Sequence, residues 1–353
     1  MRIFKQYEKV YINIFRIIKS KEKESLKQIV CNILCLVLLL NIAACGSKTE
    51  KKENLLNSTD HLNIAKQLVL GYIPLYIMEE NGWLEEALSE AGYDVKVKYT
   101  EFESGPPENE AFAVGEQDIG VMGNVPAISG IAAGQKRDII GIAYNGEKTL
   151  GILVQKNSNI TEVEGLRGKK IGIVIGSIAQ DFLNAMLENS GMEMSDVELI
   201  NLGVSELETA LLTEQVDAVA MWNPTMLKIC ADEAGILLVD GTGVYAGENV
   251  IVANKEYTSQ NPDIVRIFME QYKRAVDELK SDFDGYAEKY SDVTGLSKEI
   301  LIQTWENSNF PVVLTEKDQE ELEKTAKFLY DQDLINAEVD MMEYLDFTFS
   351  GKE

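Results

Sequence analysis

Histidine and cysteine are scarce in this chain of 353 residues, which contains one histidine and four cysteines. The single histidine, His61, lies in a polar stretch, so we expect neither a catalytic histidine nor a histidine-based metal site. The formal net charge of −25 argues against nucleic acid as a partner, because phosphate binding needs a basic face. The G-x-S-x-G and G-x-x-x-x-G-K-[ST] motifs of serine hydrolases and phosphate-binding loops are also absent. We therefore predict no enzyme activity and no cofactor.

The first 44 residues are basic and end in a short apolar run, IVCNILCLVLLLNIAAC. This layout is typical of a secretory signal peptide; the alternative is a signal anchor that is not cleaved. Ile42-Ala43-Ala44-Cys45 resembles the lipobox of bacterial lipoproteins, in which the cysteine is lipidated, for example with palmitate. We predict a lipoprotein signal peptide over 1–44, a lipid on Cys45 that anchors the chain to the outer face of the cell membrane, and a flexible tether over 45–65.

Only Cys45 and Cys230 remain once that signal peptide is removed, so no internal disulfide is expected. From residue 66 onward, short apolar runs alternate with amphipathic segments. Strands are predicted over 66–73, 93–102, 118–123, 137–144, 149–155, 169–176, 197–203, 217–222 and 249–257. Helices are predicted over 74–92, 106–116, 126–134, 177–191, 204–215, 223–235, 261–280 and 314–335. This alternation indicates an α/β fold with mostly parallel sheets flanked by helices.

Two stretches of this series resemble each other. GEQDIGVMGNVP, which ends at Pro126, and TEQVDAVAMWNP, which ends at Pro224, each carry a helix end, an apolar run, and then Asn and Pro before the next helix. They suggest two α/β lobes built alike. We expect the first part of lobe 1 over 66–147, lobe 2 over 148–240, and a return to lobe 1 with C-terminal helices over 241–353. Open α/β sheets bind ligands at the carboxyl ends of their strands, so two facing lobes predict a cleft.

Four helix starts are candidates for this cleft, because free backbone N–H groups at a helix N-terminus attract anions. These helix starts lie within four stretches, which are Ser104-Gly105-Pro106-Pro107, Gly123-Asn124-Val125-Pro126, Gly176-Ser177-Ile178-Ala179-Gln180 and Trp222-Asn223-Pro224. Each also has a simpler interpretation, since small residues and proline are ordinary helix caps and a lone tryptophan is more often a core residue. Asp240-Gly241-Thr242-Gly243 has turn chemistry and is interpreted as a hinge.

Three strings together resemble the aliphatic sulfonate, taurine and nitrate type of ABC-transporter substrate-binding protein. They are EFESGPPENEAFAVGEQDIGVMGNVPAISGIAAG, DVELINLGVSELETALLTEQVDAVAMWNP and DGTGVYAGENVIVANKEY, within a similarity that covers roughly 66–280. The resemblance implies a two-lobed periplasmic-binding-protein-like fold (type II), joined by two crossover strands, that closes on its ligand. It also implies delivery to an ABC permease driven by a separate ATPase subunit, and a lipoprotein of a Gram-positive cell that we expect to be a monomer.

The resemblance further implies which residues line the cleft: Tyr72, Ser104, Gly105, Asn124, Pro126, Ser177, Ile178, Ala179, Gln180, Trp222 and Asn223. Three positions depart from the family's pattern. Ile73 stands for a glutamine after the first strand, Gln180 for a histidine, and Asn223 for an aspartate. The expected ligand is a small sulfonate-type oxyanion held by neutral donors, with its tail against Trp222 and Tyr72. The loss of the aspartate disfavours an ammonium-bearing ligand such as taurine, unless Glu103 or Glu248 replaces it.

Other functions stay open at this point. Nitrate or a thiamine-precursor pyrimidine are alternative ligands within the same class of receptor. An enzyme on the same scaffold and a surface adhesion module are alternatives from other classes. The absence of a cleft histidine disfavours the enzyme, and the adhesion module predicts no small-molecule ligand.

Overall fold

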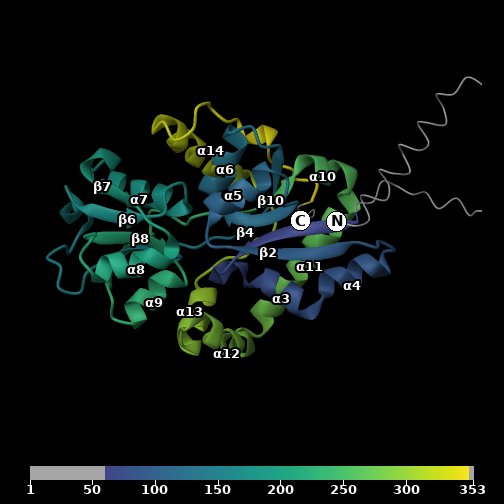
Figure 1. The fold of residues 1–353 in the computed structure, drawn as a ribbon, viewed down its shortest axis with the longest axis horizontal. Coiled ribbons are helices and arrows are strands. Elements are labelled where there is room, and N and C mark those ends of the chain that lie inside the picture. Colours follow the sequence, from purple (N-terminus) through teal and green to yellow (C-terminus); the bar gives the residue numbers. More distant parts are fainter. Residues whose placement is uncertain (1–59, 350–353) are drawn as a thin grey trace, which may run out of the picture. The chain divides into compact units, whose positions relative to one another are not determined.

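A computed structural model describes residues 60–349 of the chain (Figure 1). The predicted signal peptide, the lipidated Cys45 and the tether before residue 60 lie outside the described residues. The described part contains two five-stranded sheets with helices on their faces. The α/β architecture is therefore as predicted, and we call each sheet with its helices a lobe.

The sheet of the first lobe has the strand order β2-β1-β3-β10-β4. Its strands are β1 (His61–Gln67), β2 (Lys96–Phe102), β3 (Ile119–Gly123), β4 (Arg137–Tyr144) and β10 (Asn249–Asn254). β1 pairs in parallel with β2 and β3, whereas β10 is antiparallel to both β3 and β4. The sheet is thus mixed and not mostly parallel as predicted, because a strand late in the sequence, β10, returns antiparallel to complete the lobe that began the chain.

The sheet of the second lobe repeats this arrangement with the order β7-β6-β8-β5-β9. Its strands are β5 (Leu150–Val154), β6 (Lys170–Ile173), β7 (Glu198–Asn201), β8 (Ala218–Trp222) and β9 (Ile236–Asp240). β6 is parallel to β7 and β8, and β5 is antiparallel to β8 and β9. β3 and β8 hold equivalent places in their sheets, so the two similar sequence stretches occupy matching positions.

Helices cover both faces of the first sheet because its buried strands are apolar on both sides. Ile64, Val121 and Ile251 belong to one apolar cluster, whereas Ala65 and Met122 belong to another, as expected when side chains alternate along a strand. The first cluster includes α3 (Ile73–Asn81), α4 (Trp83–Glu90) and α11 (Pro262–Ser281). The second includes α5 (Gly105–Ala113), α6 (Asn124–Ala132) and α14 (Glu316–Asp331), on the opposite side of the sheet in Figure 1.

The remaining helices complete the two lobes. In the second lobe, α7 (Ile178–Asn189) lies on one side of the sheet, and α8 (Val204–Leu212) and α9 (Thr225–Ala231) lie on the other (Figure 1). α10 (Lys255–Gln260), α12 (Phe283–Thr294) and α13 (Lys298–Glu306) follow the return to the first lobe. The chain passes between the lobes twice, through residues 145–149 and 241–248.

The structure corrects several predicted boundaries. β1 begins at His61, inside the range expected for the tether, and ends at Gln67, whereas Leu70–Tyr72 form a 3-10 helix. The helix predicted over 74–92 is divided at Gly82, whose φ of 63° is left-handed and ends α3. β9 was not predicted at all. Its strand is half-exposed at the edge of the sheet, which weakens the apolar pattern that marks buried strands.

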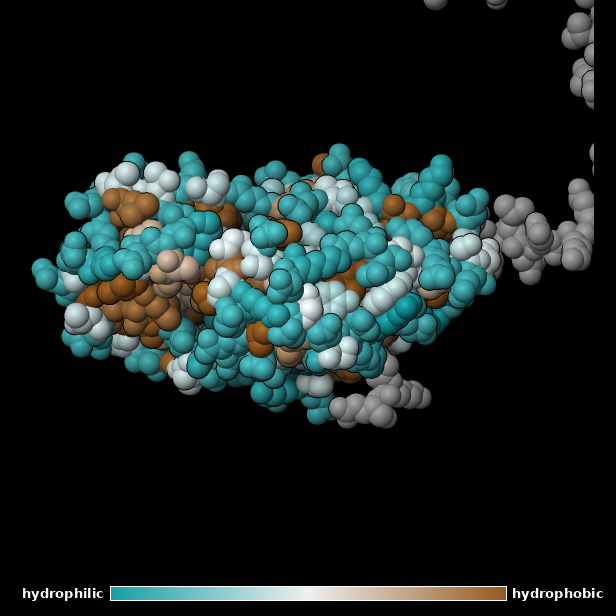
Figure 2. All heavy atoms as spheres, turned by 90° about the horizontal axis from the view of Figure 1, so that it is seen from below, coloured by the Kyte–Doolittle hydropathy of each residue, from teal (hydrophilic) through white to brown (hydrophobic). Residues whose placement is uncertain are grey.

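Two features of the described residues concern contact with a membrane: the length and polarity of the helices, and the apolar side chains exposed on the surface. Within residues 60–349, helices long and apolar enough to cross a bilayer are absent. Large apolar side chains exposed on the second lobe include Ile175, Leu212, Ile236 and Leu237. Figure 2 shows an apolar area on this lobe, surrounded by hydrophilic residues.

Candidate functional site

A small cavity of about 20 Å³ lies where strand ends of both lobes meet. Such a volume is enough for about one water-sized group. Residues that precede or open helices α5, α6 and α7 contribute to it, as do the ends of β1, β4 and β8. The lining residues are Gln67, Val69, Tyr72, Gly105, Gly123, Pro126, Tyr144, Leu150, Ser177, Ile178, Trp222 and Asn249.

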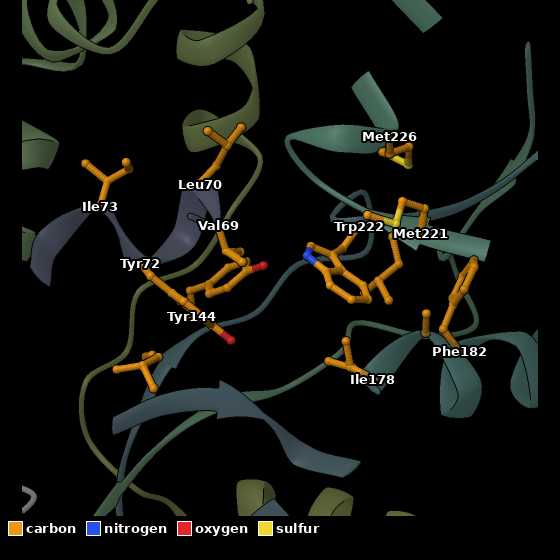
Figure 3. Close-up of a cluster of buried hydrophobic side chains, with 14 of the residues drawn as sticks. Val69, Leu70, Tyr72, Ile73, Tyr144, Ile178, Phe182, Met221, Trp222 and Met226 are labelled. Atoms are coloured by element: carbon orange, nitrogen blue, oxygen red, sulfur yellow. The ribbon is translucent and has the colours of Figure 1, made fainter. Parts of the chain in front are cut away.

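Aromatic side chains form two opposing walls of the cavity. Tyr72 and Tyr144 of the first lobe meet edge to face, with ring centroids 5.6 Å apart and planes at 76°. Trp222 ends β8 in the second lobe and is only 6% exposed. Figure 3 shows its indole nitrogen turned toward the two tyrosines across the cavity. The indole N–H can therefore donate to a ligand between the lobes.

Tyr72 is held in place by a hydrogen bond from its hydroxyl to Oδ1 of Asn249, over 2.6 Å. Asn249 begins β10, so this contact joins the first segment of the lobe to its last strand. Burial raises the pKa of Tyr72 well above its ordinary value, and the ring stays neutral. Burial likewise raises the pKa of Tyr144. Neither hydroxyl therefore adds a negative charge to the cavity.

The first turn of α5 offers one backbone donor. Gly105 is the first helical residue, and Pro106 and Pro107 after it have no N–H. The N–H of Glu108 already donates to the carbonyl of Ser104. In the described chain the amide of Gly105 has no acceptor, as is common for the first residue of a helix. A side chain at Gly105 would collide with Pro126, so the close packing of α5 on α6 needs glycine here.

The first turn of α7 offers a second backbone donor from the opposite lobe. The Ala179 amide donates to Oγ of Ser177 over 3.3 Å, and the Gln180 amide donates to the Ser177 carbonyl over 3.0 Å. The amide of Ile178 has no acceptor among residues 60–349. Ser177 is 2% exposed, and its hydroxyl donates to the Val174 carbonyl over 2.7 Å. Ser177 thus caps the helix as well as lining the cavity.

The first turn of α6 does not provide the donors that the sequence suggested. The amide of Asn124 donates to the Glu248 carbonyl over 3.0 Å, and the amide of Val125 donates to Oδ1 of Asn124 over 2.9 Å. Pro126 has no N–H. The prediction that Asn124 presents a free helix N-terminus to an anion is therefore wrong. Pro126 and Gly123 still line the cavity.

The side chain of Asn124 belongs to a different feature, a hydrogen-bond network between the lobes. Its Nδ2 lies 3.1 Å from Oδ2 of Asp181 and 2.8 Å from Oγ1 of Thr325. Asp181 lies on α7, and it also accepts from the hydroxyls of Tyr245 (2.9 Å) and Thr325 (3.0 Å). We call these four residues the interlobe network. Burial raises the pKa of Asp181 to about 6, although its hydrogen bonds oppose this shift.

The other predicted residues do not line the cavity. Ser104 is the residue before α5 and is 5% exposed. Ala179 is fully buried, and Oε1 of Gln180 accepts from the Gly176 amide over 2.9 Å. Asn223 lines a neighbouring groove of about 200 Å³ and donates to the Lys148 carbonyl over 3.2 Å. Glu248 is also buried away from the cavity.

Gln67 is the most important residue that the sequence analysis missed. It ends β1 and lines the cavity, whereas Ile73 lies in α3 and is fully buried. β1 therefore ends at Gln67, and Ile73, which was predicted to follow the end of the first strand directly, lies in α3 instead. Val69, Tyr144, Leu150 and Asn249 were missed as well. Polar residues at the ends of apolar strands, such as Gln67 and Asn249, were the available signal.

The lining contains neither acidic nor basic side chains. Glu108, a carboxyl in contact with the lining residue Gln67, is fully buried and accepts a hydrogen bond of 2.7 Å from Nε2 of Gln67. Burial raises the pKa of Glu108 to about 8, so it is mainly protonated at neutral pH. Clusters of histidine, cysteine and carboxylate suited to a metal ion are absent from residues 60–349. The site thus offers neutral donors and aromatic walls.

Comparison with known proteins places this geometry in a family. The family model described as NMT1/THI5 like matches residues 71–283. The chain belongs to the NMT1/THI5-like family. It is 32% identical over 327 residues to an aliphatic sulfonates-binding protein of Bacillus subtilis (strain 168), covering 91% of this chain and 95% of that protein. The predicted resemblance to sulfonate-binding proteins is confirmed.

Solved structures agree on the fold of this NMT1/THI5-like chain. The alkanesulfonate-binding protein SsuA from Xanthomonas axonopodis pv. citri, bound to MOPS, superposes with a TM-score of 0.73 and 25% identity, covering 82% of this chain and 99% of that one. The desulfurization enzyme DszB superposes with a TM-score of 0.61 at 18% identity, covering 82% and 97%. Because a binding protein and an enzyme share the fold, the fold alone does not decide between these functions.

Proposed function

We propose that this protein is the extracytoplasmic solute-binding component of an ABC importer and captures a small sulfonate-type oxyanion between its lobes. The observation that carries this proposal is the convergence of neutral donors from both lobes on one cavity. Gly105 and Ile178, whose amides have no acceptor among residues 60–349, line it together with Trp222, and acidic side chains are absent from its lining. Anions bind well to such donors in a site shielded from water.

The small volume of the cavity supports a closing mechanism. A cavity of about 20 Å³ has room for about one water-sized group, so the lobes must separate for a larger ligand to enter. Contacts between the lobes are already present: Oε1 of Glu103 accepts from the Ser205 amide over 3.0 Å. We infer that residues 145–149 and 241–248 act as the hinge between lobe 1, which comprises 61–144 and 249–349, and lobe 2, which comprises 150–240. Glu103 thereby serves closure rather than an ammonium group.

A binding role is favoured over an enzymatic one. His61 is exposed at the start of β1, the opposite end of that strand from Gln67, so it cannot act as a base at the cavity. Burial raises the pKa of the Cys230 thiol, which disfavours it as a nucleophile. The sulfonate-binding relative covers nearly the whole chain, which supports the same role. Turnover of a bound sulfonate by the full chain would contradict this part of the proposal.

We place the protein on the outer face of the cell membrane of a Gram-positive bacterium, anchored by lipid on Cys45 as a monomer. The motif Ile42-Ala43-Ala44-Cys45 supports the anchor. Such an anchor keeps the ligand-loaded protein near its permease and the separate ATPase subunit. Substitution Cys45→Ser tests this directly. We expect the variant to leave the membrane fraction, and its retention there would contradict lipid anchoring at this residue.

Calorimetric titration of the full chain in detergent tests the ligand class. The panel comprises ethanesulfonate, longer alkanesulfonates, taurine, nitrate and a thiamine-precursor pyrimidine. We expect alkanesulfonates to bind most tightly, because the cavity offers donors and the aromatic walls accept an apolar tail. Nitrate has no tail and should bind more weakly. Binding of the pyrimidine alone would exclude the sulfonate assignment.

A further inference from the structure

The amide of Gln67 is oriented by two acceptors behind the cavity wall. Its Nε2 donates to Oε2 of Glu108 over 2.7 Å and to the carbonyl of Val121 over 3.3 Å. A backbone carbonyl can only accept, so the nitrogen must occupy this side. Within residues 60–349 the Oε1 atom of Gln67 has no donor, although Gln67 lines the cavity. The amide therefore offers the ligand an acceptor.

Glu108 can hold this orientation because it is fixed and isolated. It is fully buried on α5, and its Oε1 atom has no hydrogen-bond partner in the described chain. Gly120 of β3 lies against that oxygen, where a Cβ atom would collide with it. Phe112 of the same helix packs beside Gly120. Among the described residues, the hydrogen bond from Gln67 is thus the one that the carboxyl of Glu108 accepts.

The charged and titratable groups that face Glu108 come from other elements. Arg137 on β4 favours the ionised carboxylate from a distance, but its side chain donates to Asn109, Gln135 and the sulfur of Met122 instead. Tyr72 faces it from the 3-10 helix and is neutral. Burial outweighs these influences and raises the pKa of Glu108 to about 8. Whether protonated or not, its Oε2 can accept from Gln67.

We propose that Glu108 is a positioning residue that turns the Gln67 amide oxygen toward the cavity, so that the site selects oxyanions carrying a hydrogen-bond donor beside the anionic group. Hydroxyl-substituted alkanesulfonates, such as 2-hydroxyethanesulfonate, are ligands of this class. An unsubstituted alkanesulfonate would leave the amide oxygen unpaired in a dry site, and a buried acceptor without a donor weakens binding. This inference rests on the proposed sulfonate-binding function.

Calorimetric titration with 2-hydroxyethanesulfonate and ethanesulfonate tests the inference on the full chain. We expect the wild-type protein to bind the hydroxylated ligand about tenfold more tightly, the scale of one paired acceptor. Glu108→Gln retains a carbonyl oxygen that can accept from Gln67 and should keep this preference. Glu108→Leu removes the shorter of the two hydrogen bonds that orient the amide, and the preference should fall below about threefold, because the Val121 carbonyl at 3.3 Å holds the amide less firmly. Gln67→Ala removes the amide and should abolish the preference. This variant provides the test if Glu108→Leu does not fold.

A pH series separates positioning from a structural role. Ionisation of Glu108 places a negative charge behind the anion, so wild-type affinity should fall as pH rises through about 8. Glu108→Gln should bind with little pH dependence in this range, which assigns the effect to Glu108.

The outcomes are distinguishable. If neither sulfonate binds the wild-type protein, the proposed function fails. If both bind equally well, or if Glu108→Leu and Gln67→Ala keep the full preference, the function stands and the role of Glu108 is refuted.

Discussion

Oδ2 of Asp181 accepts a hydrogen bond from Nδ2 of Asn124 over 3.1 Å, and this contact joins α7 of the second lobe to α6 of the first. The hydroxyls of Tyr245 and Thr325 donate to the same oxygen. Tyr245 lies in the second connecting segment and Thr325 in α14. One carboxyl thus gathers donors from the first lobe and from the hinge. Its position on α7, three residues after the cavity-lining Ile178, links closure to the site.

The interlobe network predicts a cost for removing Asp181. Asp181→Ala should lower ligand affinity by about 10- to 100-fold, because hydrogen bonds to a carboxylate contribute about 1.5–3 kcal/mol each and are not additive. Small-angle scattering should show a larger radius of gyration for the ligand-free variant. Asp232→Ala is a matched control, since Asp232 lies in an exposed pair with Lys228 on the same lobe. Equal effects of the two substitutions would contradict a closing role.

Trp222 is expected to contribute both a wall and a donor. Trp222→Phe keeps an aromatic wall and loses the indole N–H, so affinity for an alkanesulfonate should fall about tenfold, near 1.4 kcal/mol. Trp222→Ala loses both and should bind at least a further tenfold more weakly. Trp83→Ala, at a partly buried ring stacked on Arg274 in the first lobe, is the control. Titration calorimetry at one pH distinguishes the three variants. Unchanged affinity in Trp222→Ala would show that the indole of Trp222 does not contribute to ligand binding.

Gly123 tests how closely the lobes must approach. A Cβ atom at this position would lie 2.8 Å from Cβ of Ile178 in the opposite lobe. Gly123→Ala should therefore hold the lobes apart and weaken binding by about 1–3 kcal/mol, the usual cost of overpacking. The melting temperature without ligand should change much less, because an open form relieves the contact. A variant that binds normally would show that closure does not bring these residues together.

Three buried carboxyl groups predict that the protein loses stability as pH rises. Burial raises the pKa of Glu108 to about 8, of Asp181 to about 6 and of Glu248 to about 9, with the nearby Asp318 adding to the last shift. The folded state binds these protons more tightly than the unfolded chain. Their stabilisation is therefore complete below about pH 4 and is lost as pH rises through each folded-state value.

We expect the melting temperature to decline between pH 5 and pH 9. Glu108→Gln should flatten this decline, because ionising Glu108 costs on the order of 4 kcal/mol by pH 9. Thermal unfolding of both proteins across this range is the measurement. Parallel curves for the two proteins would show that Glu108 is already ionised when folded.

The sequence predicted the two α/β lobes because alternation of apolar runs and amphipathic segments is set by local residues. It located β1 wrongly because the apolar residues of 68–73 continue the strand pattern, although they pack as a 3-10 helix and the start of α3. Strand ends are decided by pairing partners, here β2 and β3, which local pattern does not show. Because the end of the strand was misplaced, Gln67 was not predicted to line the site.

The candidate site was predicted in part for a similar reason. Six expected residues line the cavity: Tyr72, Gly105, Pro126, Ser177, Ile178 and Trp222. The N–H groups at a helix start are free only if no other segment accepts hydrogen bonds from them. The backbone N–H of Asn124 donates to the carbonyl of Glu248, which is distant in sequence. The direction of the Asn124 side chain likewise depends on Asp181 and Thr325 in other elements. Such long-range contacts are not encoded in the motif that suggested the site.

The central claim is that donors from both lobes hold a sulfonate group. A crystal structure of the full chain with ethanesulfonate tests it most directly. We predict that sulfonate oxygens lie within about 3.2 Å of the amide nitrogens of Gly105 and Ile178 and of Nε1 of Trp222, which is hydrogen-bonding range. A ligand found instead in the groove beside Asn223, or bound without contact to either helix start, would contradict the account.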